Sequence, residues 1–196
     1  MIVNEIFYSL QGEGCHSGTP AVFVRLSGCN LRCPFCDTQH EGGVGMSEPA
    51  VVEAVSQYPA SLVVVTGGEP ALQLTASLVD ALHAAGRRVA VETNGTRPLP
   101  ASVDWITLSP KAAFVAGAEV VLARADEIKV LYDGIHDPDR QLAALRTPLP
   151  TLLFLQPCDV GDPLRNAQLA AAAVAYCKAH PRWRLSLQIH KILNIR

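Results

Sequence analysis

The sequence lacks long apolar runs, and this limits where the chain can work. No stretch approaches the roughly 18 consecutive apolar residues that a membrane-spanning helix needs, so we expect no membrane partner. Residues 1–10 do not combine a cationic segment with a long apolar one, so we expect no secretory signal. Both absences predict a cytoplasmic location.

Charged residues are also scarce, and neither sign dominates. They make up 17% of the 196 residues and the formal net charge is −2, so the basic excess that attracts nucleic acid is missing. Apolar residues make up 49%, which is typical of a globular chain and not of a disordered one. A chain of this length is most simply one domain, and we predict a single domain over residues 1–196.

Cysteine, in contrast, is plentiful, with six residues in the chain. Where no export signal is expected, clustered thiols bind metals more often than they form disulfides. Cys29, Cys33 and Cys36 lie at C-x3-C-x2-C spacing inside the segment 28–38. Three thiolates on one tight loop can converge on a single metal centre and leave one coordination position open for a substrate or cofactor.

A structural zinc loop is the alternative interpretation of this segment. Structural zinc takes four ligands, and either His40 or Cys15 could complete the set. The cysteine spacing alone leaves both interpretations open. We interpret Cys158 and Cys177 as small apolar residues and not as further ligands.

Strand and helix patterns alternate along the chain, which predicts right-handed crossovers and a parallel sheet. The second helix, which follows Pro70 and stops at Gly86, is expected to bury Leu72 on its apolar stripe. Since a closed eight-stranded barrel needs about 250 residues, we predict an α/β fold: a shortened, open partial (β/α) barrel with about six parallel strands. Strands are expected before Gln11 and at 21–26, 62–66, 88–92, 105–108, 127–131, 151–155 and 184–188, and helices at about 48–57, up to Gly86, and from Asp162 to about Ala179.

Polar clusters follow these strands where each one ends. The carboxyl ends of parallel strands carry the active site in such folds, so several clusters at one rim indicate a ligand site. Arg25, a charge inside an apolar strand, needs an anionic or polar partner, either a local carboxylate or a ligand. The clusters are the cysteine loop, GGEP, ETNG, SPK, QPCD and QIHK.

The cysteine spacing, with the aromatic Phe35 before the last cysteine, resembles the radical S-adenosylmethionine (SAM) enzymes. Over nearly the full length, the chain further resembles the 7-carboxy-7-deazaguanine synthases, the radical SAM enzymes of deazapurine biosynthesis. QGEG, CDT and QIHK are the narrower signals, because GGEP indicates only a radical SAM enzyme. The resemblance is carried by FYSLQGEG, GCNLRCPFCDT, VTGGEP, VETNG, LSPK, the QP pair at Gln156 and HPRWRLSLQIHK.

The resemblance implies a fold of the radical SAM type and a [4Fe–4S] cluster whose open iron binds SAM. In that family, reductive cleavage of SAM gives a 5′-deoxyadenosyl radical that removes the C6 hydrogen of 6-carboxy-5,6,7,8-tetrahydropterin. A Mg²⁺-assisted ring contraction then releases ammonia and gives 7-carboxy-7-deazaguanine, a precursor of queuosine and other 7-deazapurines. The resemblance also implies an electron donor such as flavodoxin and a homodimer.

Site residues are carried over position by position. The resemblance implies that Cys29, Cys33 and Cys36 hold the cluster and that Thr38 binds Mg²⁺, with no catalytic side chain beyond the cofactors. The main-chain carboxylate of Arg196 is expected to reach the pterin. Substrate contacts are expected from Leu10, Gln11, Gly12, Glu13, Arg25, Thr66, Glu92, Asn94, Gln188, His190 and Arg196, and SAM contacts from Gly68, Ser109, Pro110, Lys111, Gln156, Pro157, Cys158 and Asp159.

Two other functions fit parts of the pattern. A glycyl-radical activase has the same cysteine spacing, but QGEG and QIHK suit a small polar heterocycle better than a protein partner. A non-enzymatic electron-transfer or zinc module would leave most of the polar clusters at the strand ends without a role. SAM cleavage under reducing conditions separates the enzyme from the non-enzymatic module, and dependence on the pterin separates the two enzymes.

Overall fold

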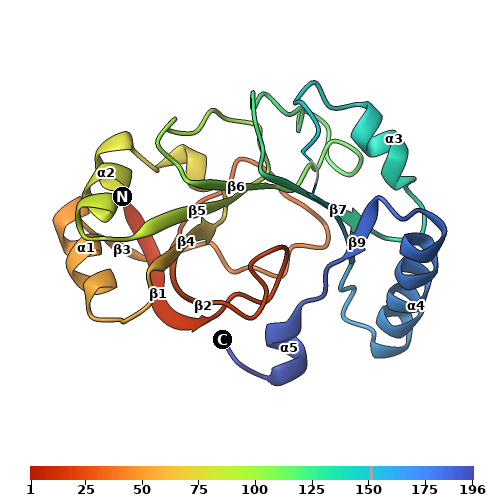
Figure 1. Cartoon of the computed structure of the whole chain (residues 1–196), viewed down its shortest axis with the longest axis horizontal. Coiled ribbons are helices and arrows are strands. Elements are labelled where there is room, and N and C mark those ends of the chain that lie inside the picture. Colours follow the sequence, from red (N-terminus) through yellow and green to blue (C-terminus); the bar gives the residue numbers. More distant parts are fainter. Residues whose placement is uncertain (151) are drawn as a thin grey trace.

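The computed structural model describes residues 1–150 and 152–196, in which the strands form one curved sheet (Figure 1). The strand order is β3-β1-β2-β4-β5-β6-β7-β8-β9. The strands are β1 (Ile2–Leu10), β2 (Pro20–Leu26), β3 (Val44–Gly45), β4 (Leu62–Gly67), β5 (Arg88–Thr93), β6 (Trp105–Leu108), β7 (Glu127–Tyr132), β8 (Leu152–Pro157) and β9 (Trp183–Leu185). The helices are α1 (Glu48–Ser56), the 3₁₀ turn η1 (Pro70–Leu72), α2 (Ala76–Ala84), α3 (Pro138–Ala143), α4 (Pro163–Ala179) and α5 (Ile189–Leu193).

The sheet is parallel from β2 through β4 to β9 and is open at its ends. β1 pairs in the antiparallel direction with both β2 and β3, so it extends the sheet without a crossover. Helices α1 to α4 lie outside the curve, while α5 lies near the C-terminus on the open side (Figure 1). The open partial barrel is therefore confirmed, with an antiparallel extension that the sequence did not predict.

The packing of the core explains why the sequences of the central strands are continuous apolar runs. Alternate residues of the central strands, such as Val63 and Val65, pack against the helices, where Leu78 and Leu82 are fully buried. Residues of the opposite face, such as Val64, pack inside the curve with Phe7 and Phe23. Each buried side chain of this size contributes roughly 1.5–3 kcal/mol relative to an exposed one. Burial on both faces fixes the sheet at the centre of the fold.

The three expected helices α1, α2 and α4 are confirmed, but the second begins later than predicted. Glu69 caps the 3₁₀ turn by accepting a hydrogen bond from Ala71 N–H, and the chain restarts as a helix after Thr75. Leu72 is therefore 43% exposed and not buried as predicted, and Leu74 takes the core position. No helix lies between β5 and β6 in the described chain, as expected from its prolines.

Helices α3 and α5 were not predicted. α3 begins with Asp137, whose carboxylate accepts hydrogen bonds from the N–H groups of Asp139 and Arg140, and with Pro138 as the first helical residue. The same cap-then-proline order, Asp162–Pro163, correctly predicted the start of α4. The last strand ends at Leu185, earlier than the predicted residue 188, so α5 takes over most of QIHK. Thr151, the predicted start of the strand at 151–155, lies outside the described residues.

None of the helices in residues 1–150 and 152–196 has both the length and the apolar character needed to cross a bilayer.

A glycine at the end of β4 provides a test of this packing. Gly67 has a φ of +126°, and a Cβ there would lie 2.0 Å from the Leu26 carbonyl oxygen. Gly67→Ala should cost about 1–2 kcal/mol in backbone strain plus about 1–3 kcal/mol in overpacking. Gly161→Ala, where φ is +73° and no atom lies within 4 Å, should cost only the strain. Thermal unfolding of both variants checks this, and equal midpoints would contradict the close packing.

Candidate active site

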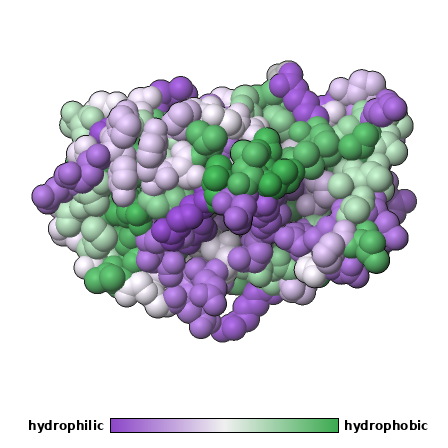
Figure 2. All heavy atoms as spheres, turned by 90° about the horizontal axis from the view of Figure 1, so that it is seen from below, coloured by the Kyte–Doolittle hydropathy of each residue, from purple (hydrophilic) through white to green (hydrophobic). Residues whose placement is uncertain are grey.

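A cavity of about 620 Å³ opens at the carboxyl ends of the parallel strands. Residues at the ends of β4, β5, β6 and β8 line it, together with the loop after β1, the cysteine loop and the C-terminal segment. Figure 2 looks at the molecule from the side where α5 lies and shows hydrophilic side chains gathered beside a hydrophobic patch. The expected strand-end site is thus one continuous cavity.

The cavity brings together nearly all of the residues that the sequence analysis assigned to the site. Pro110 is the exception, because it lines a neighbouring cavity while Ser109 and Lys111 line this one. The predicted residues that line the active-site cavity are Leu10, Gln11, Gly12, Glu13, Arg25, Cys29, Cys33, Cys36, Thr38, Thr66, Gly68, Glu92, Asn94, Ser109, Lys111, Gln156, Pro157, Cys158, Asp159, Gln188, His190 and Arg196.

The cysteine loop is closed by its own backbone. Gly28 N–H donates to the His40 carbonyl over 2.7 Å, and Cys36 N–H donates to the Cys33 carbonyl over 3.2 Å. All three loop cysteines are free thiols, with Cys36 exposed. Burial raises the pKa of the Cys29 and Cys33 thiols, and the positive charge of Lys111 opposes the shift at Cys33. The loop therefore presents its three sulfurs from a fixed base.

The end of β4 holds this base in place. Gly68 N–H donates to the Leu26 carbonyl over 3.1 Å, and Glu69 N–H donates to the Gly28 carbonyl over 2.9 Å. A Cβ at Gly68 would lie 2.0 Å from the Gly28 oxygen and 3.0 Å from Cys29 Cβ, so only glycine permits this approach. The two glycines of GGEP thus allow the end of β4 to pack against the start of the cysteine loop.

These cysteines fit a cubane cluster. Within the described part of the chain, no three His, Cys, Asp or Glu side chains converge on a single ion. A [4Fe–4S] cluster does not need such convergence, because each thiolate binds a different iron. Three free cysteines on one closed loop at a cavity wall are the donor set that such a cluster requires.

Glu69, the acidic residue of GGEP, is 1% exposed and joins neighbouring strand ends. Its carboxylate accepts hydrogen bonds from the Thr93 hydroxyl and from Asn94 N–H, each over 2.7 Å. Burial raises the Glu69 pKa, and these hydrogen bonds oppose the rise. The Asn94 side chain then donates to Asn30 of the cysteine loop over 3.2 Å. Glu69 and Asn94 therefore position the loop.

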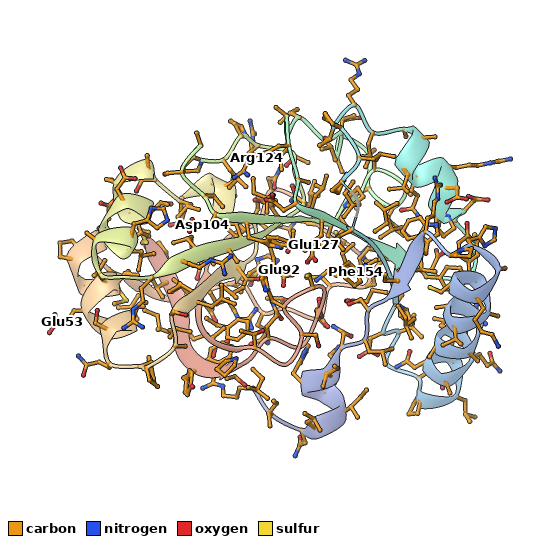
Figure 3. The ribbon with its side chains drawn as sticks, in the orientation of Figure 1. Glu53, Glu92, Asp104, Arg124, Glu127 and Phe154 are labelled. Atoms are coloured by element: carbon orange, nitrogen blue, oxygen red, sulfur yellow. The ribbon has the colours of Figure 1, made fainter. Side chains whose placement is uncertain are left out.

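Lys129 of β7 is the principal site residue that the sequence analysis missed. Its side chain is 4% exposed, and its ammonium pairs with the carboxylates of Glu13 and Glu92, the latter over 2.8 Å. Gln11 donates to Glu92 over 2.9 Å, and Gln188 donates to Glu13 over 3.0 Å. Figure 3 shows the Glu92 side chain beneath the sheet, on its open side. The network joins QGEG, β5, β7 and QIHK.

The pKa shifts agree with an ionised network. Burial alone raises the Glu13 pKa, but the charge and hydrogen bond of Lys129 more than offset it and hold the pKa below its ordinary value. Burial alone lowers the Lys129 pKa, but Glu13 and Glu92 raise it above its ordinary value. Burial, together with the charge of Lys129, lowers the pKa of Lys111 to about 8. Lys129 therefore stays protonated to a higher pH than Lys111 does.

The C-terminal segment closes one side of the cavity. Lys191 Nζ lies 2.6 Å from Asp37 Oδ2 and 2.7 Å from Asp159 Oδ2, which ties α5 to the cysteine loop and to the end of β8. Its hydrogen bond lowers the pKa of Asp159 to about 2. Ile189 N–H also donates to the Gly12 carbonyl over 3.0 Å. QIHK and QGEG therefore form one continuous wall.

Arg25 was expected to need an anionic or polar partner, and Glu5 is that partner. Arg25 Nε lies 2.7 Å from Glu5 Oε1, and the Arg196 side chain also pairs with Glu5. Phe7 stacks on Phe23 with ring centroids 4.9 Å apart, and the Arg196 guanidinium lies 5.0 Å from the Phe7 centroid. Glu5, Phe7 and Phe23 line the cavity but were not predicted.

The curved sheet and the three-cysteine loop define a radical SAM protein, and a model of the Radical SAM superfamily matches residues 23–147. The chain is 51% identical to a 7-carboxy-7-deazaguanine synthase from Bacteroides thetaiotaomicron, over 99% of this chain and 98% of that protein. It is 43% identical to one from Nitratidesulfovibrio vulgaris, over 98% of each chain. The crystal structure of QueE from Escherichia coli superposes with a TM-score of 0.78 at 30% identity, covering 95% of this chain and 93% of that one. The chain therefore belongs to the 7-carboxy-7-deazaguanine synthase family.

The Lys129 network predicts a pH-dependent stability. Since the Glu13 pKa is lowered, its contribution is present above its ordinary value of 4.5 and is lost as the pH falls through the folded value. Since the Lys129 pKa is raised, its contribution is present below its ordinary value of 10.5 and is lost as the pH rises through the folded value. Both contributions are present between these limits.

Lys129→Met should therefore cost roughly 3–5 kcal/mol at pH 8, because it leaves buried carboxylates without a cation. Part of that loss should be recovered at pH 5, where Glu13 takes up a proton more readily without its partner. Urea unfolding at the two pH values measures both effects. Lys178→Met, at an exposed lysine of α4, is the matched control and should be nearly neutral. A Lys129→Met loss no larger than the control would contradict the network.

Proposed function

We propose that this chain converts 6-carboxy-5,6,7,8-tetrahydropterin to 7-carboxy-7-deazaguanine and ammonia by a radical ring contraction, in the route to queuosine or other 7-deazapurines. The observation that carries the proposal is the joining of the segments QGEG, CDT and QIHK around one cavity through Lys129 and Lys191. When bound, the [4Fe–4S] cluster and SAM supply the radical that removes a hydrogen atom from the substrate. The residues described below would bind the cofactors and the substrate, orient them, and shield them from solvent.

At the cluster end, Cys29, Cys33 and Cys36 would hold the three protein-bound irons. Lys111 donates hydrogen bonds to the main-chain oxygen and the hydroxyl of Ser109, over 2.9 and 2.5 Å. With a pKa of about 8, Lys111 is mostly protonated at neutral pH and can face an anionic group of SAM. The remaining SAM contacts are proposed for Gly68 and for the segment from Gln156 to Asp159.

At the substrate end, Glu13 and Glu92 can accept hydrogen bonds from the N–H groups of a pterin. Lys129 holds Glu13 ionised, so that it acts only as an acceptor. Arg25 offers a guanidinium to the substrate carboxylate, with Glu5 fixing its orientation. We propose that the pterin lies between this pair and the ionised network, beside Thr66, the loop from Leu10 to Gly12, Asn94 and His190.

A magnesium ion is proposed at Thr38. Its hydroxyl lies 3.5 Å from Asp37 Oδ1 at the cavity wall. Magnesium is usually bound by one or two protein oxygens and completes its shell with waters and substrate oxygens. The substrate carboxylate is the natural further ligand. Arg196, whose main-chain oxygen accepts a hydrogen bond from Ser9 Oγ over 2.5 Å, also lines the cavity.

We also propose that residues 1–196 form a single radical SAM domain, since one sheet and one principal core run through the fold. An external donor such as flavodoxin would supply the electron, and the exposure of Cys36 supports access to the cluster from solvent. A homodimer is proposed from the family resemblance.

The test of this function is anaerobic reconstitution followed by mass spectrometry of the products formed from 6-carboxytetrahydropterin, SAM and reductant. The native enzyme should form 7-carboxy-7-deazaguanine and regenerate SAM. Cys29→Ala, Cys33→Ala and Cys36→Ala should each abolish reductive SAM cleavage, because two thiolates cannot hold three irons of a cubane. Cys177→Ala, in the distant helix α4, should keep the activity. SAM cleavage without conversion of the pterin would reject the proposed substrate.

The magnesium proposal has its own test at Thr38. Thr38→Ala should keep the cluster and SAM cleavage but slow pterin turnover by about 10- to 100-fold, because one ligand oxygen is lost. Thr38→Ser keeps the hydroxyl and should retain most of the activity. Turnover is measured against Mg²⁺ concentration for all three proteins. An equal loss in both variants would assign the effect to packing of the methyl group.

A further inference from the structure

The loop that joins β1 to β2, residues 11–19, carries the QGEG residues of the proposed pterin site. A main-chain pair closes its base, because Gln11 N–H donates to the Thr19 carbonyl over 2.8 Å. This pair fixes where the loop leaves and rejoins the sheet. It leaves the N–H groups of Gly14 and Cys15, in the middle of the loop, to be paired elsewhere.

Glu127, at the start of β7, pairs with one of these groups. Its carboxylate accepts a hydrogen bond from Cys15 N–H at one oxygen and from the Thr107 hydroxyl at the other, each over 2.8 Å. Glu127 is 2% exposed, and a Cβ at Gly14 would lie 2.3 Å from its Oε1. A buried carboxylate therefore packs directly against the middle of the loop, although the mechanism proposed above does not use it.

The sheet register places Glu127 beside the charge network. Thr107 of β6 lies opposite Glu92 of β5 on one side and opposite Glu127 of β7 on the other. Residues in register share a face of the sheet, and Lys129, two residues after Glu127, shares it as well. Figure 3 shows the Glu127 and Glu92 side chains beneath the sheet, on its open side. The residue that supports the loop thus belongs to the same polar row as the network.

Ser186, the residue after β9, pairs with the other N–H group of the loop. Gly14 N–H donates to Ser186 Oγ over 3.0 Å, and this hydroxyl donates to Gln156 Oε1 over 2.8 Å. Both Ser186 and Gln156 are buried. Two consecutive N–H groups are therefore held by side chains from distant strands. Since these groups directly follow Glu13, holding them fixes the main chain that carries the Glu13 carboxylate.

The contact between Glu127 and the loop does not require a charge. Burial raises the pKa of Glu127, and the hydrogen bonds from Thr107 and Cys15 oppose the rise, as does the charge of Lys129. In either protonation state a carboxyl oxygen remains to accept from Cys15 N–H, and the Thr107 hydroxyl can donate or accept. A carboxamide of the same length can therefore make both contacts.

We propose that Glu127 is a positioning residue for pterin binding, which holds the loop at Cys15 so that the Glu13 carboxylate meets the N–H groups of the substrate. The proposal rests on the proposed function, because that function assigns the pterin to Glu13. A purely structural Glu127 would stabilise the fold and leave the affinity for the pterin unchanged. The two roles therefore differ in the quantity that a substitution alters.

The first test is equilibrium dialysis of the cluster-loaded enzyme with 6-carboxytetrahydropterin, in the presence of SAM and without reductant. Glu127→Leu should weaken pterin binding at least about tenfold, because Cys15 N–H loses its acceptor. Glu127→Gln should bind like the native enzyme. Glu127→Asp keeps the charge but is one methylene shorter, so it should weaken binding as Glu127→Leu does. SAM binding without the pterin should be unchanged in all three.

Asp126→Leu is the matched control. Asp126 is the neighbouring carboxylate and also accepts a main-chain hydrogen bond, from Ile106 N–H over 2.8 Å, but it does not contact the loop. Its variant should bind the pterin like the native enzyme even where its unfolding midpoint falls. Equal pterin affinity in Glu127→Leu and the native enzyme overturns the proposal, as does a loss of the same size in Asp126→Leu.

The second test is hydrogen–deuterium exchange without the pterin, which reports on the loop itself. Peptides from residues 11–19 should exchange at least about tenfold faster in Glu127→Leu, and at the native rate in Glu127→Gln. Peptides from α4 should not change. Equal exchange in the loop overturns the proposal. If Glu127→Leu did not fold, Glu127→Asp would decide by the same two measurements.

Failure of the proposed function has a different signature. A native enzyme that does not bind the pterin would reject that function, and the exchange rates alone would then decide whether Glu127 positions the loop. Pterin binding that is the same in the native enzyme and in Glu127→Leu would instead keep the function and reject the role of Glu127.

Discussion

The buried charge network around Lys129 is the constraint on which the rest of the site depends. One ammonium, 4% exposed, pairs with both Glu13 of the loop after β1 and Glu92 of β5, and through Glu13 it reaches Gln188 beside α5. Breaking such a buried pair is more costly than never forming it, so these segments keep their relative positions. The network therefore gives the cavity its shape from the two ends of the chain and the middle of the sheet together.

Local patterns made much of this arrangement predictable. The cysteine spacing, the apolar runs that become β2 and β4 to β8, and the cap-then-proline start of α4 are each encoded within a few residues. Parallel pairing then places the polar strand ends at one edge, which is why nearly every expected site residue lines one cavity.

The parts that sequence reasoning missed depend on contacts between distant segments. Leu72 is exposed because Glu69 caps a separate 3₁₀ turn. The same carboxylate accepts a hydrogen bond from the Thr93 hydroxyl of β5. QIHK becomes helical where Lys191 reaches Asp37 and Asp159, neither of which is near it in sequence. Lys129 is different: a lysine in the apolar run EIKVL carries the same signal that singled out Arg25, so it was within reach of the sequence.

The closed base of the cysteine loop bears on how the holoenzyme is made. The hydrogen bond from Gly28 to His40, and the bond from Glu69 to Gly28, join the ends of the loop through protein atoms alone. Part of the entropic cost of closing the loop is therefore offset by hydrogen bonds within the chain and not by binding of the cluster. Small metal-dependent domains are closed by the metal itself, whereas in this chain main-chain hydrogen bonds contribute to closing the loop that carries the three cysteines.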